Sequence, residues 1–400
     1  MRSRYVHRVW KPRSDALGTR RYRRPCDYSA FIPERVADTT FTLPIELTAD
    51  LADAEAAVLR LQQPDDRLFD PLLHLLMRSE SIASSRIEGI QVDARDLARA
   101  EARGRIGRRV GARAREVISN IEAMQLAIGH AAAVDQVTLR DLLSIHEVLM
   151  RGQLQTAGQV RTAQNWIGGN DHNPCGADFV PPPPELVPDL LEDLCAFCNS
   201  DQMPPLVQAA IAHAQFETIH PFDDGNGRTG RALMHILLRR RGLAALVTPP
   251  ISVALAHARG AYINGLVAYR DDKLDEWFEI IASATLSSVA LAERYRISVG
   301  DLLAEWQRRL REGANPRSDA AAWLILEQLP SYPVLNRADA AEFSGRSLPA
   351  VDLGLRQLED AGILDPIRDQ SPSRRSWEPS GLLDLIIELE SEAPMGLRAG

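Results

Sequence analysis

The residues with the clearest chemical potential lie together in one short stretch, from His220 to Arg231, which reads HPFDDGNGRTGR. Glycines in such a stretch let the backbone approach a phosphate closely, and a helix that starts there offers free N–H groups to an anion. Arg228 and Arg231 are three residues apart and share a helix face. Two guanidiniums at a helix N-terminus are unfavourable unless an anion neutralises them. The stretch therefore predicts a polyphosphate site.

Two side chains next to this anion site could supply chemistry. Asp224 precedes the glycines, where a carboxylate can hold Mg²⁺ against phosphate oxygens. His220 lies four residues earlier, and a neutral imidazole there can take the proton from an attacking hydroxyl. Such general-base catalysis is worth about 10²- to 10⁴-fold in rate. The combination predicts phosphoryl or nucleotidyl transfer, in which positioning and charge stabilisation do most of the work.

A dinucleotide site, a phosphate loop and a purely structural turn all fit the stretch less well. The G-x-G-x-x-G spacing from Gly225 matches the dinucleotide fingerprint, but that motif follows a strand, whereas the residues before His220 have helical periodicity. A phosphate loop requires a lysine after a glycine, and the two lysines, Lys11 and Lys273, do not follow one. A core histidine with a glycine turn and surface arginines would explain any single feature, but not the clustering.

The elements around the motif are mainly helical, because apolar residues recur at three- to four-residue spacing and strand signals are sparse. Helices are predicted over residues 206–219, before the motif, and over residues 226–241, where Gly242 is a natural stop. Residues 160–181 are the exception, since apolar residues there flank a Gly-Gly-Asn tip that is typical of a β-hairpin. The predicted fold class is therefore mostly α, with a β-hairpin.

At 400 residues the chain is too long for one core, so two or three domains are expected. We divide it into a basic N-terminal arm, a helical N-terminal region, a helical core with the motif, a connecting helix with its linker, and a small C-terminal domain. These cover residues 1–30, 31–114, 115–285, 286–317 and 318–390. The last shows three helical runs and two short strands around a polar loop, as in a winged helix-turn-helix. Its recognition helix is largely acidic, so DNA binding and a structural role both stay open.

Charge and cysteine content indicate the class of protein. The net charge is −8, but residues 1–24 carry +8 and the rest carries −16, unlike a protein that coats nucleic acid. Four cysteines are too few for a disulfide framework, and Cys195-x-x-Cys198 lies in an apolar stretch typical of packing. Neither a signal peptide nor an apolar run of about 18 residues is evident. We expect a soluble cytoplasmic protein with reduced cysteines and no membrane contact.

The stretch from His220 resembles the motif of the Fic (Fido) family, HPFx[DE]GNGRxxR, at every defined position. Residues 158–169 and 179–182 resemble the family's flap hairpin, and the predicted winged helix accompanies many Fic domains. The resemblance implies a Fic-type helical core and a protein adenylyltransferase, which moves AMP from ATP to a Ser, Thr or Tyr hydroxyl and releases pyrophosphate. It also implies ATP as substrate, Mg²⁺ as metal ion and a protein as the acceptor, and it leaves a homodimer open.

The resemblance further implies roles for individual residues. His220 would be the general base, Asp224 the Mg²⁺ ligand, and the flap would align the target's backbone by strand addition. The implied nucleotide-binding residues are Ile167, Gly168, Gly169, Asn170, Asp224, Gly225, Asn226, Gly227, Arg228, Thr229, Gly230, Arg231, Tyr262 and Arg270. Within this set, the two motif arginines would hold the β- and γ-phosphates.

A glutamate far from the motif has an unusual position. A helix over about residues 67–89 ends in Ser-Ser-Arg-Ile-Glu-Gly, so Glu88 lies in its last turn, where the dipole disfavours a carboxylate by about 0.3–1 kcal/mol. Taken alone, the residue could equally be a solvated surface glutamate. However, Ser84 and Glu88 match the inhibitory motif of the Fic family, [ST]xxxE[GN]. The resemblance implies that Glu88 pairs with Arg231 and keeps the resting enzyme inactive.

Three functions therefore stay open. The first is AMPylation of a protein, including the enzyme itself. The second keeps the site but removes AMP from targets or transfers another phosphate-bearing group. The third is a DNA-binding regulator whose Fic domain senses nucleotide. Transfer of label from ATP would favour an enzyme, whereas salt-dependent binding of duplex DNA by residues 316–400 would favour the regulator.

Overall fold

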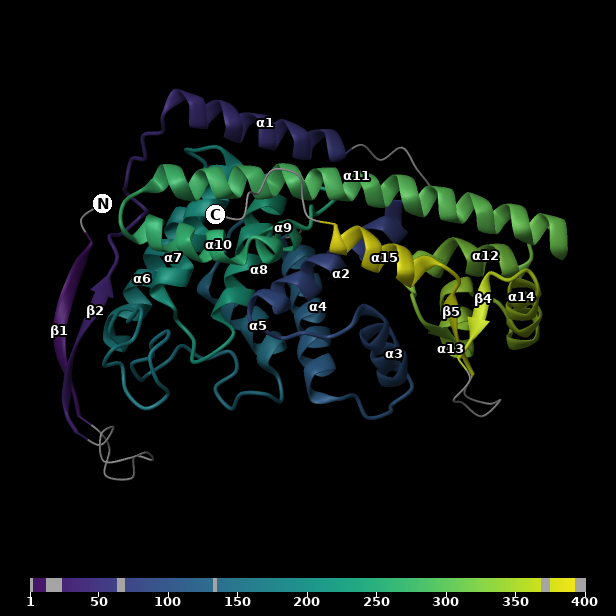
Figure 1. Ribbon diagram of the computed structural model, residues 1–400, viewed down its shortest axis with the longest axis horizontal. Coiled ribbons are helices and arrows are strands. Elements are labelled where there is room, and N and C mark those ends of the chain that lie inside the picture. Colours follow the sequence, from purple (N-terminus) through teal and green to yellow (C-terminus); the bar gives the residue numbers. More distant parts are fainter. Residues whose placement is uncertain (1–2, 12–23, 63–68, 132–134, 368–374, 393–400) are drawn as a thin grey trace.

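The computed structural model describes residues 3–11, 24–62, 69–131, 135–367 and 375–392. It is mostly helical, as expected, and its sheets are small (Figure 1). The helices are α1 (Ile45–Leu61), α2 (Phe69–Ile87), α3 (Ala94–Arg105), α4 (Ala112–Ala131), α5 (Leu139–Met150), α6 (Val187–Cys198), α7 (Pro205–Ile219), α8 (Asn226–Arg240), α9 (Ile251–His257), α10 (Arg259–Arg270), α11 (Leu274–Gly313), α12 (Ala321–Gln328), α13 (Arg337–Ser344), α14 (Leu348–Asp360) and α15 (Leu382–Ser391). The strands are β1 (Arg4–Trp10), β2 (Cys26–Ile32), β3 (Leu335–Asn336), β4 (Leu364–Pro366) and β5 (Ser376–Pro379).

The two helices that flank the motif, α7 and α8, form the centre of the larger core. α7 is buried from Leu206 to Ile219, because small and apolar residues occur on all its sides and leave no polar face. α8 is buried from Asn226 to Leu238. The helices α1, α4, α5, α6, α10 and the first half of α11 contribute the surrounding apolar residues. The motif is therefore held between two helices that their neighbours enclose.

Helix α11 runs along the molecule and joins its two ends, with α1 beside it (Figure 1). Its first part places Trp277 in the core around α7, and its last part places Trp306 in the core of the C-terminal unit. One continuous helix therefore crosses the boundary expected between residues 285 and 286, and its two parts pack in different cores. The division of the chain into domains stays a prediction. Neither α11 nor any other described helix combines the length and apolar composition needed to span a bilayer.

The C-terminal unit, residues 321–379, contains α12, α13 and α14 and a three-stranded antiparallel sheet in the order β3-β5-β4. α15 then leads back along α11 (Figure 1). The loop expected as the wing includes residues 368–374, which lie outside the described residues. Assignment of this unit as a winged helix stays a prediction.

Residues 1–30 are not simply a basic arm. β1 and β2 pair antiparallel from Arg4↔Ile32 to Trp10↔Cys26, and the segment 12–23 between them lies outside the described residues. β2 also reaches the flap, because the N–H of Phe31 donates to the carbonyl of Val180 at 2.9 Å. Charge patterning could not reveal this hairpin, because its apolar neighbours come from residues far along the chain.

A disulfide between Cys26 and Cys175 joins β2 to the loop after the flap tip, with Cα atoms 6.2 Å apart. The expectation of reduced cysteines is therefore wrong for this pair, whereas Cys195 and Cys198 are free thiols. The two bonded cysteines are 149 residues apart, so only the fold brings them together.

Thiol titration of the denatured, unreduced protein should find two free cysteines, and four after reduction. Removing a cross-link over a long loop typically costs about 2–5 kcal/mol, so reduction should lower the melting temperature. Cys26→Ser should melt like the reduced protein. Cys195→Ser is the matched control and should keep the difference between oxidised and reduced forms. Four reactive thiols before reduction would contradict the assignment.

Candidate active site

The motif occupies the turn between α7 and α8. His220 ends α7 in the left-handed conformation, with φ 49° and ψ 61°. Gly225 precedes α8 with φ 79°, and a Cβ there would lie 2.9 Å from the sulfur of Met150, so glycine is required. The Asn226 side chain accepts from the N–H of Phe222 and donates to its carbonyl, both at 2.8 Å. These bonds fix the loop that carries His220 against the start of α8.

The His220 imidazole is neutral at pH 7. Burial, followed by the charge of Arg161, lowers its pKa to about 4. The side chain keeps 17% of its surface exposed, so a substrate can reach it. Nδ1 lies 3.3 Å from the carbonyl oxygen of Glu217. A proton on Nδ1 therefore points to this carbonyl and leaves the Nε2 lone pair for an incoming hydroxyl.

The guanidinium of Arg228 is buried, and part of it has no hydrogen-bond acceptor among the described residues. Its side chain is 3% exposed, and within the described residues Nε and Nη1 have no hydrogen-bond partner. Its Nη2 lies 3.6 Å from the sulfur of Met150 and 3.9 Å from Oδ1 of Asp224. Burying such a group without partners is costly. Phosphate oxygens would supply the missing acceptors, so this residue fits the predicted anion site.

Asp224 stands at the exposed side of the same turn, with 69% of its side chain accessible. Its Oδ1 accepts from the N–H of Gly225 at 2.6 Å. No group of three or more His, Cys, Asp or Glu side chains suited to a metal occurs in the described part of the chain. A lone carboxylate still fits Mg²⁺, because this ion usually takes one or two carboxylates together with phosphate oxygens and water.

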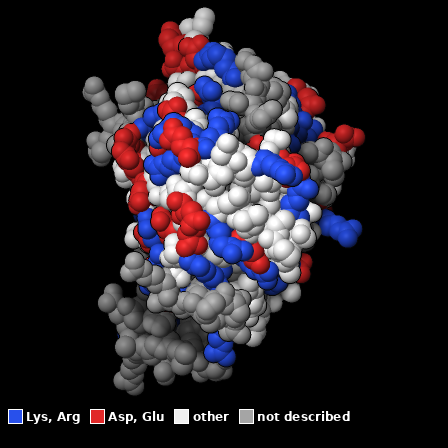
Figure 2. All heavy atoms as spheres, turned by 90° about the vertical axis from the view of Figure 1, so that its right-hand side faces the viewer, with Lys and Arg blue, Asp and Glu red and all other residues white. Residues whose placement is uncertain are grey.

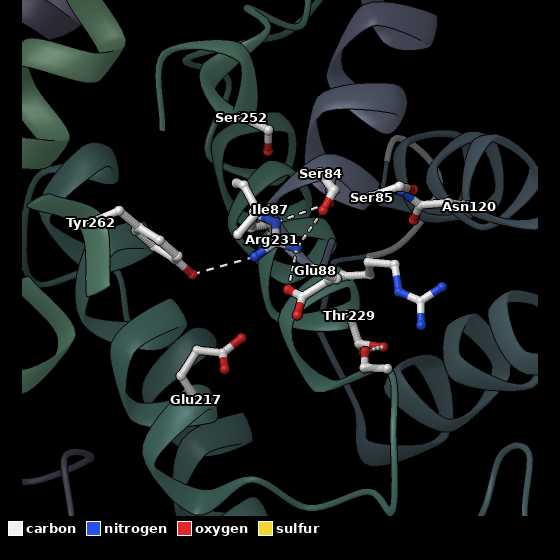
Figure 3. Close-up of polar contacts among 12 residues, drawn as sticks. Ser84, Ser85, Ile87, Glu88, Asn120, Glu217, Thr229, Arg231, Ser252 and Tyr262 are labelled. Atoms are coloured by element: carbon white, nitrogen blue, oxygen red, sulfur yellow. Dashed lines mark hydrogen bonds and ion pairs between the residues drawn. The ribbon is translucent and has the colours of Figure 1, made fainter. Parts of the chain in front are cut away.

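Arg231, by contrast, is bound by Ser84 in helix α2 and by Glu88 just after this helix. Its Nη2 donates to Oε1 of Glu88 at 2.7 Å and to the carbonyl of Ser84 at 2.8 Å, and Nε donates to Oγ of Ser84 at 2.9 Å (Figure 3). The expected Glu88–Arg231 contact is therefore present. Burial acts to raise the pKa of Glu88, but the charge and hydrogen bond of Arg231 outweigh it and hold the pKa below its usual value. Glu88 is thus ionised at pH 7.

The Glu88 carboxylate also lies on the first turn of α8. A Cβ on Gly227 would collide with its Oε1 and would lie 3.1 Å from Nη1 of Arg231. A helix N-terminus favours a negative charge at this place. Glu88 therefore occupies part of the anion site that the motif predicts, and it binds the second motif arginine at the same time.

Glu80, two turns before Glu88, anchors α2 in this register. Its Oε1 lies 2.8 Å from Nε2 of His235, which is four residues after Arg231 on α8. Its Oε2 accepts from the N–H of Ser252 at 2.7 Å. The side chains of the Glu80–His235 pair are fully buried. Glu80 therefore ties α2 to α8 and to the start of α9, at a point two helical turns before Glu88.

The flap differs from the expected hairpin. Its strands share a single antiparallel bridge, Ile167↔Phe179, and the rest of the segment is irregular. Gly168 and Gly169 turn the chain with φ of 74° and 73°. Asn170 does not face the motif; its Oδ1 accepts from the N–H of His172 at 2.9 Å and so holds its own loop. Side-chain hydrogen bonds thus replace the strand ladder that the apolar residues on both sides of the Gly-Gly-Asn tip suggested.

Other predicted nucleotide contacts serve packing in this arrangement. Tyr262 is buried, and its hydroxyl lies 2.9 Å from Nε2 of His213 and 3.3 Å from Nη1 of Arg231. Thr229 donates to the carbonyl of Gly225 at 2.9 Å. Gly230 is also a packing position, where a Cβ would crowd α7. The Arg270 guanidinium lies 4.0 Å from the ring centroid of Phe179, which joins α10 to the flap.

Glu217 is a site residue that sequence reasoning missed. Its carboxyl points toward the Arg231–Glu88 pair, and its Oε1 lacks a hydrogen-bond partner among the described residues (Figure 3). Burial, and then the charge of Glu88, raise its pKa to about 8, so the carboxyl is protonated at pH 7. Its position three residues before His220 was the one available signal, since residues at this spacing share a helix face.

Fold and site together define a class: a helical domain with a buried arginine at a helix start predicted to bind phosphate, a neutral histidine beside it, and a glutamate from just after a second helix lying on the first turn. Residues 136–238 match the model of the Fic/DOC family, and residues 48–129 match the model of the Fic/DOC family N-terminal region. These two parts of the chain are therefore similar to the Fic/DOC domain and to its N-terminal region, and the resemblance found in the sequence is confirmed.

Curated relatives are similar to part of the chain. Protein adenylyltransferase fic-1 of Caenorhabditis elegans is 34% identical over 119 residues, which cover 29% of this chain and 22% of that protein. Protein adenylyltransferase Fic of Culex quinquefasciatus is 34% identical over 155 residues, which cover 38% of this chain and 28% of that protein. The matched region thus spans less than a third of these relatives.

Solved structures agree on the fold. A Fic family protein from Desulfovibrio desulfuricans superposes with a TM-score of 0.53 at 23% identity, over 85% of this chain and 98% of that one. A Fic domain-containing signaling protein from Bacteroides thetaiotaomicron gives a TM-score of 0.50 at 19% identity, over 62% of this chain and 96% of that one. The Fic-type helical fold is therefore established across most of the chain.

Proposed function

We propose that this protein is a protein adenylyltransferase that moves AMP from ATP to a Ser, Thr or Tyr hydroxyl of a protein, itself included. The observation that carries the proposal is the neutral His220 next to a helix start where Nε and Nη1 of buried Arg228 have no hydrogen-bond partner among the described residues. The names of the curated relatives support the same activity. Transfer of AMP from ATP needs a general base and groups that bind the phosphates, and the turn from His220 to Arg231 offers both.

Each residue of the site has its own role in the proposed reaction. His220 Nε2 takes the proton from the acceptor hydroxyl, whose oxygen then bonds to the α-phosphorus while the bond to the β-phosphate oxygen breaks and pyrophosphate leaves. Arg228 and the first N–H groups of α8 hold the phosphates. Asp224 would hold Mg²⁺, which supplies neutralising charge when bound. Arg231 completes the cradle only after Glu88 has released it, so the resting protein is inhibited.

Incubation with α-³²P-ATP and Mg²⁺, followed by mass spectrometry, tests the activity. Label and the added mass of AMP on a Ser, Thr or Tyr residue are expected, most clearly in Glu88→Gly. Loss of AMP from a pre-modified protein under the same conditions would instead favour the reverse reaction at this site. No transfer in either direction would refute the proposal.

Glu80→Gln should raise transfer, but less than Glu88→Gly does, because it loosens the register of α2 without removing the blocking carboxylate. The change weakens a fully buried polar contact with His235, and leaving a buried polar group unsatisfied typically costs about 1–3 kcal/mol, so the melting temperature should fall. If Glu80 acts only through Glu88, the double variant transfers no more AMP than Glu88→Gly. A further increase in the double variant would contradict this account.

The C-terminal unit favours a structural role over DNA binding. The end of the molecule that carries it shows acidic and basic side chains intermixed (Figure 2). Arg337 pairs with Asp352 at 2.5 Å, and Arg375 pairs with Glu359, so these guanidiniums are already neutralised. A duplex backbone requires unpaired cations. Absence of salt-dependent binding to duplex DNA would agree with a structural role.

Two other expectations from the sequence, a cytoplasmic location and a homodimer, stay predictions.

A further inference from the structure

Arg161 is a buried cation whose partners are backbone carbonyls. Its side chain donates from Nε to the carbonyl of His220 at 2.8 Å and from Nη2 to the carbonyl of Pro182 at 2.6 Å. Its Nη1 donates to the carbonyl of Ala163 at 3.1 Å. The residue is only 3% exposed. One guanidinium therefore joins the start of the flap, the end of the flap and the last turn of α7.

The place where these bonds converge is the end of α7, whose last carbonyls have no partner within the helix. A cation is favourable there because the dipole is negative at a helix C-terminus. The backbone bond from the N–H of Arg161 to the carbonyl of Pro221, at 2.9 Å, adds a second tie. Asn165 contributes a third, since its Nδ2 donates to the carbonyls of His220 at 3.2 Å and Phe222 at 2.9 Å.

These hydrogen bonds stabilise an otherwise unfavourable backbone conformation at His220. His220 has φ 49°, in the left-handed region, where a residue with a side chain is strained and persists only if its surroundings fix it. A helix that continued past Ile219 would point the imidazole elsewhere. The carbonyl of His220 is the atom that both Arg161 and Asn165 bind.

We propose that Arg161 is the positioning residue for His220: its guanidinium ties the left-handed turn that presents the imidazole to both ends of the flap, so that base and flap form one rigid unit. The proposal rests on the adenylyltransferase function proposed above. The same guanidinium has an electrostatic consequence, because a cation near an imidazole disfavours its protonation. The charged or titratable groups that act on this imidazole are Arg161 from the flap, Glu217 from α7, Glu88 from the turn after α2, and Asp224 from the loop.

Three variants separate positioning from charge, and each is made in wild type and in Glu88→Gly. Arg161→Met keeps a long aliphatic side chain but removes the guanidinium, and with it both the hydrogen bonds and the charge. Arg161→Lys keeps the charge but cannot span the same carbonyls. Asn165→Ala removes only the neutral bonds to the turn. Arg35→Met, at an exposed arginine 4.0 Å from Asp189, is the matched control.

The first readout does not depend on activity. An NMR titration follows the His220 imidazole, whose signal is identified by its loss in His220→Ala. Arg161→Met should raise the pKa of His220 by roughly half a unit to one unit, because one nearby cation is gone. Arg161→Lys and Asn165→Ala should leave it nearly unchanged. This titration decides the electrostatic part even if the protein transfers no AMP, in which case only the proposed function fails.

The second readout is AMP transfer in the Glu88→Gly background. Arg161→Met and Arg161→Lys should lower kcat by about 10²-fold with little change in KM for ATP, as expected for a misplaced base, and Asn165→Ala should lower it less. Arg35→Met should change neither quantity. If Arg161→Met does not fold, the other two variants decide. Folded Arg161 variants with wild-type kcat and an unshifted His220 pKa would overturn the proposal.

Discussion

Replacing Glu88 with glycine should raise AMP transfer by roughly 10- to 150-fold. Glu88 holds Arg231 through a bond of 2.7 Å and lies on the first turn of α8, so ATP must displace it before its phosphates can bind. A hydrogen bond to a charged group is worth about 1.5–3 kcal/mol, and each 1.4 kcal/mol changes an equilibrium about tenfold. The measurement is the initial rate of label incorporation from α-³²P-ATP into the protein itself.

Two control variants test whether the increase in rate arises from loss of the Glu88–Arg231 contact. Glu88→Gln keeps the shape but loses the charge, so an intermediate rate is expected, because an amide oxygen still accepts from Arg231 more weakly than a carboxylate. Glu122→Gly makes the same change at an exposed glutamate on α4 and should leave the rate unchanged. Equal rates for wild type and Glu88→Gly would show that the observed contact does not limit the enzyme.

Removing the imidazole in the activated protein should abolish this gain. In Glu88→Gly, a further His220→Ala change is expected to lower transfer by about 10²- to 10⁴-fold, because general-base assistance to the acceptor hydroxyl is lost. Binding of ATP should persist, since the phosphate-binding arginines are untouched. Calorimetric titration with ATP and Mg²⁺ checks binding, and mass spectrometry checks transfer. Undiminished transfer would mean that His220 is not the base.

The same histidine sets the pH dependence. Burial lowers the pKa of His220 to about 4, so the base form is present above that value and is lost as pH falls through it. The rate in Glu88→Gly should therefore stay level from pH 8 to pH 6 and decline only near pH 4. A solvated histidine would instead lose its base form near pH 6.5. A decline centred on pH 6.5 would contradict the burial of this imidazole.

Much of the fold was predictable because its signals are local. Pro204 and Pro205 mark the start of α7, and Gly242 follows the end of α8, so the predicted ranges 206–219 and 226–241 differ from the observed helices by one residue at an end. Glycine at 225 likewise indicates the left-handed turn. These features depend on backbone preferences of individual residues, which a sequence shows directly.

The flap and the N-terminal segment were predicted less well. Apolar residues on both sides of a glycine-rich tip in residues 160–181 suggested a hairpin, but side-chain bonds such as that of Asn170 to its own loop leave a single bridge. β2 pairs with β1 and reaches Val180, where charge alone suggested a tail. In both cases the partner of the strand decides its structure, and strand partners lie at distances along the chain that no local pattern reports.

By itself the sequence determined which groups meet in the turn from His220 to Arg231, because neighbours in a short loop cannot be far apart. The pairing of Glu88 with Arg231 followed from a resemblance. Only the tertiary structure decided that Glu80 contacts His235, that Arg161 binds the end of α7, and that Cys26 bonds Cys175. Each of these contacts joins distant segments, and packing of the helical core, not residue type, brings such segments together.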